Sequence, residues 1–354
     1  MKPRVLYLHI GTEKTGTTTL QALAAANRAL FAQNGLCYPR TPGDRNHMAL
    51  AAYASDGQTT RDLNPVPGLE DPIRRAVFRE EFAEALRAEV ASSGASLVWL
   101  SNEHLSSRLQ SVDEIKRLAS LLLPLADQIR VVVYLRHQPD LFLSFYSTLI
   151  KSGNDGEMEP PVNGDEYFYN FEMMLDNWAA AFGESALSVR VYDKSVLRHG
   201  DIVIDFLDMI GFDLPPDAYM PERENVRLDT YTLQFLRLFH RDIPGAGPDG
   251  PDPMHGDIIT ALEALSKGPP LAAPAKLMRE IDEAFRASNN RVARRFLRRD
   301  GGLFPPVTYQ DPPASSLLTP GHAVKIAAGL WRHKQLQLFK ARAAARRGGG
   351  GGSL

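Results

Sequence analysis

Residues 5–21 read VLYLHIGTEKTGTTTLQ, a pattern that predicts a strand, a loop and a helix in succession. An apolar, β-rich run leads into a loop between two glycines, and threonines then open an amphipathic helix. N–H groups in the loop and in the first helical turn can converge on a phosphate, because the positive end of the helix dipole attracts anions. The residues expected to hold the phosphate are Lys14, which adds a movable charge, and Thr15, Gly16, Thr17, Thr18 and Thr19.

The order of residues in this loop indicates which phosphate compound it binds. A Walker A loop is G-x-x-x-x-G-K-[ST], with the lysine after the second glycine. Here Lys14 precedes Gly16 and Thr17 stands in the lysine position, so an ATP site is disfavoured. The string KTGTT instead resembles the 5′-phosphosulfate loop of sulfotransferases, which transfer a sulfuryl group from 3′-phosphoadenosine 5′-phosphosulfate (PAPS). A purely structural Gly/Thr turn is the alternative for this loop taken alone.

A second segment, IRVVVYLRHQPDLFLSFY at 129–146, supports the same interpretation. An apolar strand ends in Arg136, a proline starts a helix, and Ser144 follows eight residues after the arginine. This pattern resembles the 3′-phosphate motif of sulfotransferases. An arginine fork and a hydroxyl both suit a dianionic phosphate, and open α/β sheets bind ligands at the carboxyl ends of their strands. Taken alone, Arg136 could equally be a solvated charge at a strand end.

The resemblance extends over most of the chain. Segments 172–183, 189–211 and 288–304 are similar in layout to bacterial carbohydrate-type sulfotransferases. Each is also explained as ordinary structure, namely an amphipathic helix, a strand-loop-helix and a solvated helix face. The last segment carries a basic stripe, for which contact with an acidic glycan or with the 3′ side of the nucleotide is the functional alternative. Its members are Arg291, Arg294, Arg295, Arg298 and Arg299.

Strand and helix signals alternate along the first two thirds of the chain. Strands are predicted at 4–10, 96–101, 129–135 and 186–192, with helices at 17–33, 71–93, 111–126, 139–151 and 170–182. Helices alone follow, at 201–211, 229–241, 257–266 and 275–298, divided by loops at 243–256 and 267–274. This pattern predicts an α/β fold: a P-loop-type parallel sheet with helices on both faces, plus a mostly helical C-terminal half.

Three parts are expected in this fold. Residues 1–215 form the PAPS-binding α/β core, 216–320 a helical part of the same sulfotransferase domain that caps the substrate, and 321–354 a basic C-terminal helix with a disordered Gly-rich tail. One cysteine, Cys37, excludes an internal disulfide framework. No apolar stretch approaches the roughly 20 residues of a membrane helix. These features and the early start of the first strand predict a soluble cytoplasmic protein.

Charge is distributed unevenly. The net charge is −2, but the sequence from Lys325 onward holds seven Lys or Arg and no acid, leaving 33 basic and 42 acidic residues before it. One interpretation is a terminal helix that packs on the body through four apolar residues, Leu330, Leu336, Leu338 and Phe339. The other is attraction to anionic lipid, as a peripheral membrane contact, or to an acidic acceptor.

Sulfuryl transfer needs a base as well as a phosphate cradle. The acceptor oxygen and the leaving oxygen lie in line with the central atom, as in phosphoryl transfer, so Lys14 is expected to stabilise the leaving phosphate. Candidate general bases are Glu103 and His104, which follow the strand 96–101, and His47 in the irregular stretch after Pro39. The resemblance favours Glu103, then His104, because carbohydrate-acting relatives tend to use a carboxylate. A capping or surface role is the alternative for His47.

The predicted function is therefore transfer of a sulfuryl group from PAPS to a hydroxyl or amine of a glycan-like acceptor. A P-loop kinase or NTPase, which would need an acid for Mg²⁺, and a non-catalytic nucleotide-binding protein are the alternatives. No metal-ligand spacing is present and no nucleic-acid partner is expected. Acceptor specificity is expected in 39–70, 152–170 and 243–274, where the aromatic stretch 165–171 offers either a sugar platform or a packing surface.

Overall fold

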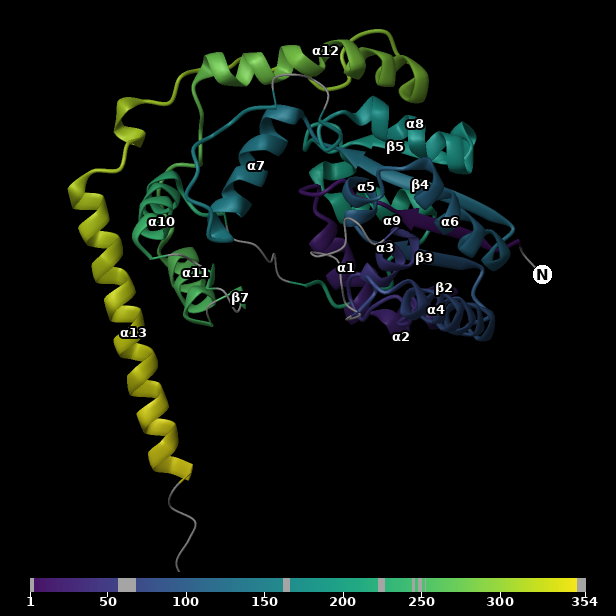
Figure 1. The fold of residues 1–354 in the computed structure, drawn as a ribbon, viewed down its shortest axis with the longest axis horizontal. Helices are drawn as coiled ribbons and strands as arrows, with labels where there is room; N and C mark the ends of the chain where they lie inside the picture. Colours follow the sequence, from purple (N-terminus) through teal and green to yellow (C-terminus); the bar gives the residue numbers. More distant parts are fainter. Residues whose placement is uncertain are drawn as a thin grey trace, which may run out of the picture. The chain divides into compact units, whose positions relative to one another are not determined.

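A computed structural model describes residues 3–56, 68–161, 166–221, 227–243, 246–247, 250–251 and 253–348. They form two compact units (Figure 1). The first comprises Met1–Leu141, Pro161–Glu224 and Glu280–Val307, and the second Phe142–Pro160, Asn225–Arg279 and Thr308–Leu354. The division at 215 and 320 inferred from sequence stays a prediction, and the Gly-rich tail at 349–354 lies outside the described residues.

A five-stranded sheet, parallel throughout, forms the centre of the first unit. Its order is β2-β3-β1-β4-β5, so β1 lies in the middle with β3 on one side and β4 on the other. The strands are β1 Val5–His9, β2 Leu36–Cys37, β3 Leu97–Ser101, β4 Gln128–Leu135 and β5 Leu187–Val191. The predicted α/β fold with a parallel sheet is confirmed. β2, at the sheet edge, is an additional short strand formed by the apolar residues before Pro39.

Both faces of the sheet are covered, which explains why its central strands are continuously apolar. On one face, Trp99 and Tyr134 pack in a core with Phe31 and Phe206, supplied by α2 (Arg28–Gln33) and α9 (Ile202–Ile210). Val131 and Val133 project to the opposite face, because side chains alternate along a strand, and they are wholly buried as well. The helices of this unit are α1 Thr17–Ala26, α2, α3 Met48–Ala54, α4 Pro72–Ser92, α5 His104–Arg108, α6 Val112–Leu122, α8 Phe171–Phe182 and α9.

A buried carboxylate ties β4, β5 and α9 together. Asp205 accepts two hydrogen bonds from Arg190, each 2.7 Å, and one of 2.7 Å from the Tyr134 hydroxyl. The N–H of Arg198 donates a further bond of 3.0 Å to the same carboxylate. Burial acts to raise the pKa of Asp205, but these hydrogen bonds outweigh it and hold the pKa below its ordinary value. Asp205 is therefore a charged structural residue that fixes α9 on the sheet.

Several boundaries differ from the sequence prediction. The helix expected over 17–33 is two helices, divided at Asn27, whose side chain exchanges hydrogen bonds with the backbone of Tyr219. The stretch after Pro39 contains α3, because its apolar residues bury four side chains. The loop expected at 243–256 contains a short hairpin of β6 (Ala246–Gly247) and β7 (Gly250–Pro251), and the helix after it begins at Pro253.

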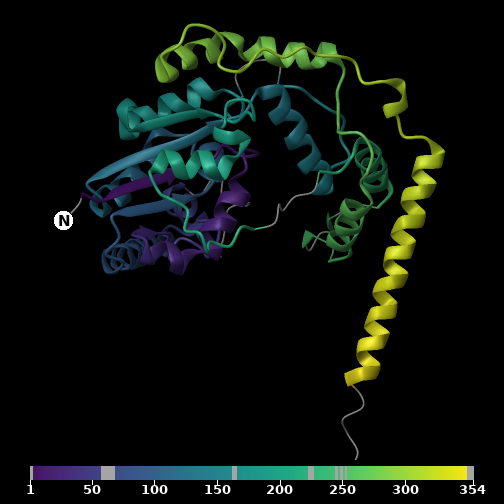
Figure 2. The ribbon, with the colours of Figure 1, turned by 180° about the vertical axis from the view of Figure 1, so that it is seen from behind.

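The second unit is helical around a small core of its own. Ile150, at the end of α7 (Gln138–Lys151), packs with Leu233, Leu236 and Leu262 from α10 (Thr230–Asp242) and α11 (Pro253–Leu265). α12, Ala275–Leu297, begins in the second unit and belongs to the first from Glu280 onward. α13, Pro320–Gly348, is the long yellow helix in Figures 1 and 2. Short 3₁₀ turns lie at Leu123–Leu125, Glu184–Ala186, Arg198–Gly200 and Ala314–Ser316.

The packing expected of the terminal helix is only partly found. Leu330 of α13 packs against the core of the second unit, but Leu336, Leu338 and Phe339 are exposed. They do not share the face of Leu330, because residues recur on one face of a helix only every three or four positions. Across the described part of the chain, no helix combines the length and the apolar character needed to cross a membrane.

Candidate functional site at the carboxyl edge of the sheet

Three loops of the first unit meet at the carboxyl edge of the sheet. They follow β1, β3 and β4, which are neighbours, and the strand order reverses at β1, the place where open α/β sheets bind ligands. The loop after β1 approaches the end of β3 so closely that a Cβ added to Gly11 would lie 3.0 Å from Cα of Glu103. On the other side, Arg136 after β4 donates a 3.0 Å hydrogen bond from Nη1 to the carbonyl of Lys14.

The loop itself is shaped by positive backbone φ angles and by β4. Gly11, Lys14 and Gly16 have φ values of 102°, 65° and 81°. Both N–H and Oγ1 of Thr12 donate to the carbonyl of Tyr134 at 3.0 Å, and Thr15 donates from Oγ1 to the carbonyl of Thr12 at 2.5 Å. Hydrogen bonds to the end of the neighbouring strand therefore hold the loop in this shape.

The first turn of α1 follows this loop directly. Gly16 is its N-cap and provides no side chain to cap the helix, and Thr17, Thr18 and Thr19 occupy the first turn. Thr17 is buried, whereas Thr18 and Thr19 are half-buried. N–H groups at the start of a helix are available to an anion when no side chain caps them. This geometry suits the phosphate cradle expected from the sequence at Lys14, Thr15 and the threonines that follow, whose phosphate contacts stay a prediction.

Glu103 is oriented by two neutral amides. Its Oε2 accepts a 2.7 Å hydrogen bond from Gln21 Nε2 and a 3.1 Å bond from Asn46 Nδ2. Gln21 belongs to α1 and is buried, and Asn46 is fixed in turn by a 2.5 Å bond from Asn102 Nδ2 to its Oδ1. The half-buried carboxylate is therefore held beside the loop of Lys14 by groups that carry no charge.

His104 faces the same loop through another residue, Glu13. Its Nδ1 lies 3.5 Å from Oε1 of Glu13, which also accepts a 2.7 Å hydrogen bond from Ser107 and lies 3.8 Å from Arg108. Burial acts to raise the pKa of Glu13, but its interactions with His104, Ser107 and Arg108 outweigh burial and lower it. Glu13 is thus a charged partner for His104 within the loop.

His47 and His9 are both wholly buried behind the site. Nδ1 of His47 accepts a 3.1 Å hydrogen bond from the N–H of Ser101, and its ring stacks on Tyr38. Nδ1 of His9 lies 2.9 Å from Oγ of Ser101. Burial lowers the pKa of each histidine to about 3, so both are neutral at physiological pH. Nε2 of His9 has no hydrogen-bond partner within the described part of the chain.

The two residues predicted to bind a 3′-phosphate fall in different units. Arg136, in the first unit, also lies over the ring of Tyr192, 6.0 Å from its centre. Ser144 lies on α7 within the second unit, where its carbonyl accepts a bond from Thr148. Their joint contact with a phosphate stays a prediction.

A cavity of about 510 Å³ is lined in part by His137, which follows Arg136. Its polar wall includes His137 and Asp282, whose Nε2 and Oδ1 are 3.0 Å apart, and its apolar wall includes Phe304, packed on the His137 ring. The other lining residues are Arg286, Asn289, Asn290, Gly301, Gly302, Leu303, Pro305, Pro306 and Val307. His137 is thus fixed by Asp282 of α12.

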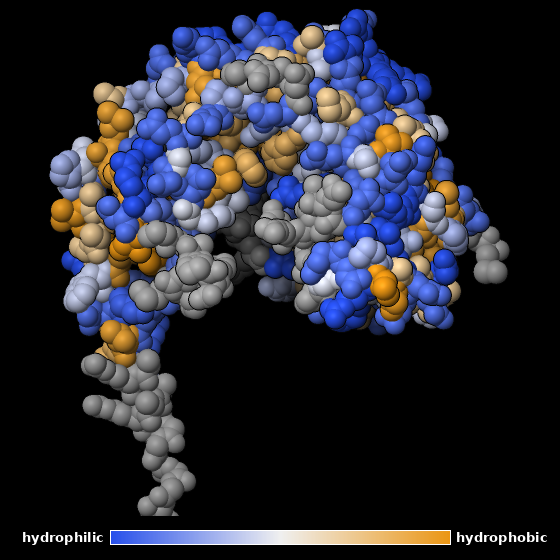
Figure 3. All heavy atoms as spheres, viewed as in Figure 1, coloured by the Kyte–Doolittle hydropathy of each residue, from blue (hydrophilic) through white to orange (hydrophobic). Residues whose placement is uncertain are grey.

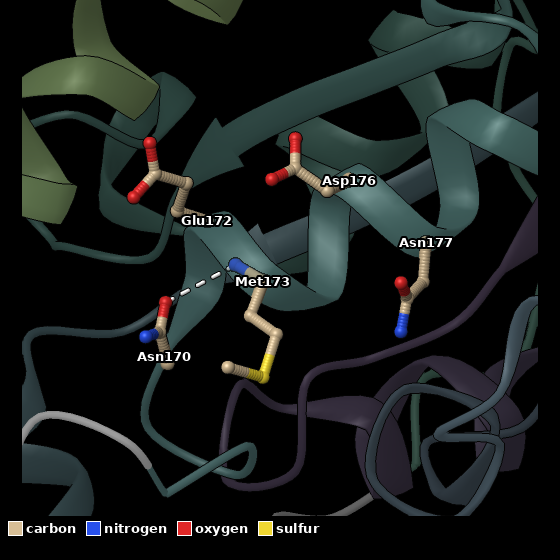
Figure 4. Close-up of a pocket in the computed structure, with 5 residues that line it drawn as sticks. All are labelled: Asn170, Glu172, Met173, Asp176 and Asn177. Carbon is tan, nitrogen blue, oxygen red and sulfur yellow. Dashed lines mark hydrogen bonds between the residues drawn. The ribbon is translucent and has the colours of Figure 1, made fainter.

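A shallower hollow on α8 is an ion-paired surface. Figure 4 shows the carboxylates of Glu172 and Asp176 on the same side of the helix, with Met173 directed away. Arg291 pairs with Glu172 through two bonds of 2.5 and 2.6 Å, and Arg295 pairs with Asp176 and with Glu184. Two members of the predicted basic stripe are therefore already neutralised.

The aromatic stretch near α8 packs inward. Tyr169 and Phe171 are buried, and the Tyr167 hydroxyl donates to the carbonyl of Leu109 at 3.1 Å. The packing alternative is therefore favoured over a sugar platform for the described residues 166–171, while Asp165 lies outside them. In the parts of the chain that the structure describes, no group of three or more His, Cys, Asp or Glu residues is arranged to hold a metal ion.

Sequence reasoning missed Glu13, Gln21 and Asn46. The signals for two of them were present: Glu13 precedes Lys14 in the loop, and Gln21 lies four residues after Thr17, on the same face of α1. Asn46 carried no signal, because only the folded chain brings it to Glu103.

Comparisons with known proteins add little to this geometry. No family model matches the sequence. An uncharacterized protein of Archaeoglobus fulgidus is 34% identical over 115 residues, which are 32% of this chain and only 31% of the relative. A sulfotransferase from Alicyclobacillus acidocaldarius is similar in structure over 63% of this chain and 87% of its own, with 16% identity and a TM-score of 0.36.

A structure of the PezAT toxin–antitoxin system of Streptococcus pneumoniae is similar over 68% of this chain and 87% of its own, with 17% identity and a TM-score of 0.28. Structural likenesses of this extent carry no argument about function. The fold rests on the strand order and register described above, and the function on the site.

Proposed function

We propose that this protein is a sulfotransferase that uses PAPS as its donor. One observation carries the proposal: the loop of Lys14, the carboxylate of Glu103 and the guanidinium of Arg136 lie on three adjacent loops at one edge of a parallel sheet. Group transfer from a phosphosulfate needs these three functions, namely a cradle for the 5′-phosphate, a base for the acceptor and a cation for the second phosphate.

The chemistry of the donor set fits this nucleotide. Lys14 and the uncapped N–H groups at the start of α1 suit the 5′-phosphate, and Arg136 suits a dianionic 3′-phosphate. Thr15, Thr17, Thr18 and Thr19 belong to the same proposed cradle, and the contact of Ser144 with the 3′-phosphate stays a prediction from the sequence. None of these assignments calls for a metal ion.

The reaction is an in-line displacement at sulfur. A bond forms between the acceptor oxygen and sulfur, and the bond between sulfur and the bridging phosphate oxygen breaks, leaving 3′-phosphoadenosine 5′-phosphate. Lys14 stabilises the charge that develops on that oxygen. Glu103 removes the acceptor proton, and its two amide partners, Gln21 and Asn46, keep the carboxylate in one orientation before substrate binds.

Glu103 is preferred as the base over the two histidines. His104 is held by the carboxylate of Glu13, and His47 is buried with its Nδ1 bonded to the backbone of Ser101. We therefore propose that His104 positions the loop through Glu13, and we keep it as the second candidate for the base. We propose that His47 supports the end of β3. The acceptor is proposed to be a hydroxyl of a glycan, on the resemblance stated above.

The decisive experiment is calorimetric titration with 3′-phosphoadenosine 5′-phosphate in EDTA, with ATP and AMP as competitors. We expect micromolar binding without metal that falls at least about tenfold in Lys14→Ala and in Arg136→Ala, since each removes a charge-assisted contact. Matched controls are Lys116→Ala, an exposed lysine on α6, and Arg130→Ala, near the start of β4, the strand that Arg136 follows.

Two results would overturn the proposal. The first is binding of ATP that requires Mg²⁺, together with no binding of 3′-phosphoadenosine 5′-phosphate. It would favour the kinase or NTPase alternative. The second result is tight nucleotide binding, unchanged in Glu103→Gln, with no sulfuryl transfer to a panel of glycan, phenol and amine acceptors. It would favour a non-catalytic nucleotide-binding protein.

A further inference from the structure

The outward face of α13, the side away from the core of the second unit, exposes large apolar side chains. Val324, Trp331 and Leu338 recur at intervals of seven residues and so lie along one side of the helix, with Phe339 next to them. The exposed fractions are 68% for Val324, 68% for Trp331, 42% for Leu338 and 70% for Phe339. Figure 3 shows apolar and hydrophilic residues next to one another along this helix.

The opposite side of α13 is already occupied. Ile326 and Leu330 pack on the core of the second unit, and His333 and Gln337, half-buried and bonded to each other, continue that side. The helix is therefore anchored by one face, and its apolar outward face has no partner among the described residues of the second unit. Packing on the body explains the inward residues and leaves the outward ones unexplained.

Charge indicates what covers the outward face. Lys325, Arg332 and Lys334 are exposed beside it, and the sequence from Lys325 onward has seven Lys or Arg and no acid. The rest of the chain has a balance of −9. A second copy of the chain, paired through this face, would bring cations against cations. An anionic lipid surface instead accepts large apolar side chains between its headgroups and attracts the flanking cations.

We propose that α13 lies on anionic membranes through the face formed by Val324, Trp331, Leu338 and Phe339, with its lysines and arginines at the headgroups. Aromatic rings prefer this interfacial depth, and long basic side chains reach the phosphates from beside them. Binding is reversible and peripheral, and it holds whatever reaction the first unit performs. The inference therefore stands independently of the sulfotransferase proposal.

Tryptophan fluorescence tests the geometry directly. The chain has three tryptophans, and Trp99 and Trp178 are wholly buried, so Trp331 is the one that responds to lipid. We expect a blue shift of emission when the full-length protein meets vesicles of phosphatidylcholine with about one third phosphatidylglycerol, and none with pure phosphatidylcholine. Brominated lipid should quench this emission. Trp331→Phe should still sediment with the vesicles but lose the shift.

Charge variants test the electrostatic part. Lys325→Gln, Arg332→Gln and Lys334→Gln together should weaken binding about 100-fold, given about fivefold for each cation near an anionic surface. The matched control removes three exposed cations elsewhere, Arg87→Gln, Lys116→Gln and Arg279→Gln, and should alter binding less than about twofold.

Three outcomes would overturn the inference. They are absence of sedimentation with the anionic vesicles, binding that leaves Trp331 emission unchanged, and equal loss of binding in the control triple. A dimer by light scattering that dissociates in Trp331→Ser, without any vesicle binding, would identify the face as a contact between copies of the chain.

Discussion

Glu103 and Asp205 are two carboxylates of the same sheet unit that are held in opposite ways. Asp205 is buried and receives both N–H groups of one edge of the Arg190 guanidinium, so a full positive charge balances it. Glu103 is half-buried beside the loop of Lys14 and accepts hydrogen bonds from the neutral amides of Gln21 and Asn46. An amide fixes the direction of a carboxylate without neutralising it, whereas a guanidinium does both.

The difference separates a structural acid from one suited to proton transfer. A carboxylate paired with a guanidinium gives up part of its attraction for protons and becomes an anchor between β4, β5 and α9. A carboxylate held by amides stays oriented and available to an incoming hydroxyl group. The four predictions that follow use this contrast, from the largest expected effect to the smallest.

Glu103→Gln should lower the rate of sulfuryl transfer by about 10²- to 10⁴-fold, the usual contribution of a general base. Glutamine keeps a similar shape, so binding of the product nucleotide and the thermal midpoint should stay close to those of the unchanged protein. Steady-state rates with a glycan acceptor, together with calorimetry, measure both. A rate that survives in this variant but disappears in His104→Gln would transfer the role of base to His104.

Asp205→Asn should show the converse pattern, with a loss of stability and no direct effect on chemistry. Removing the charge leaves Arg190 without its carboxylate, but Arg190 is itself partly exposed, so we expect about 2 kcal/mol rather than the larger cost of a fully buried pair. Urea unfolding followed by fluorescence measures this, with the exposed Asp217→Asn as the matched control. A loss of nucleotide affinity in Asp205→Asn without a loss in the free energy of unfolding would contradict the structural role.

Gln21→Leu tests whether orientation by an amide matters. The variant keeps the side chain's size but removes the 2.7 Å bond to Glu103, so the turnover rate should fall about tenfold, corresponding to the 1–1.5 kcal/mol of one hydrogen bond. Nucleotide affinity should not change, since Gln21 is assigned no contact with the donor. The matched control is Gln110→Leu, which removes an exposed amide outside the site. An equal fall in both variants would refute a specific role.

At low pH, the contribution of Asp205 to the free energy of unfolding should be lost. Its pKa is lower in the folded than in the unfolded chain, so its contribution is complete above the ordinary aspartate value of about 4 and is lost as pH falls through that value toward the folded one. The stability difference between the unchanged protein and Asp205→Asn should therefore shrink below about pH 4 and be constant from pH 6 to 8. Urea midpoints across this range provide the measurement, and a constant difference down to pH 3 would contradict it.

Much of the first unit was predictable from local sequence. The strands at 4–10, 96–101, 129–135 and 186–192 were placed correctly, because apolar runs bounded by turns are typical of buried parallel strands. The carboxyl edge was predicted as well, since Lys14, Glu103 and Arg136 each follow a strand. The break at Asn27 was not predicted, because it depends on Tyr219, which lies 192 residues away.

Local sequence was enough to predict the strand-loop-helix at 5–21, the parallel sheet and the basic amphipathic character of α13, all of which follow from residue types at short spacings. Only the tertiary structure decided that Glu103 is held by Gln21 and Asn46, which are 82 and 57 residues away, and that α13 turns Leu330 inward and Trp331 outward. The physical reason is that these outcomes depend on which distant surfaces meet, and local patterns carry no record of distant partners.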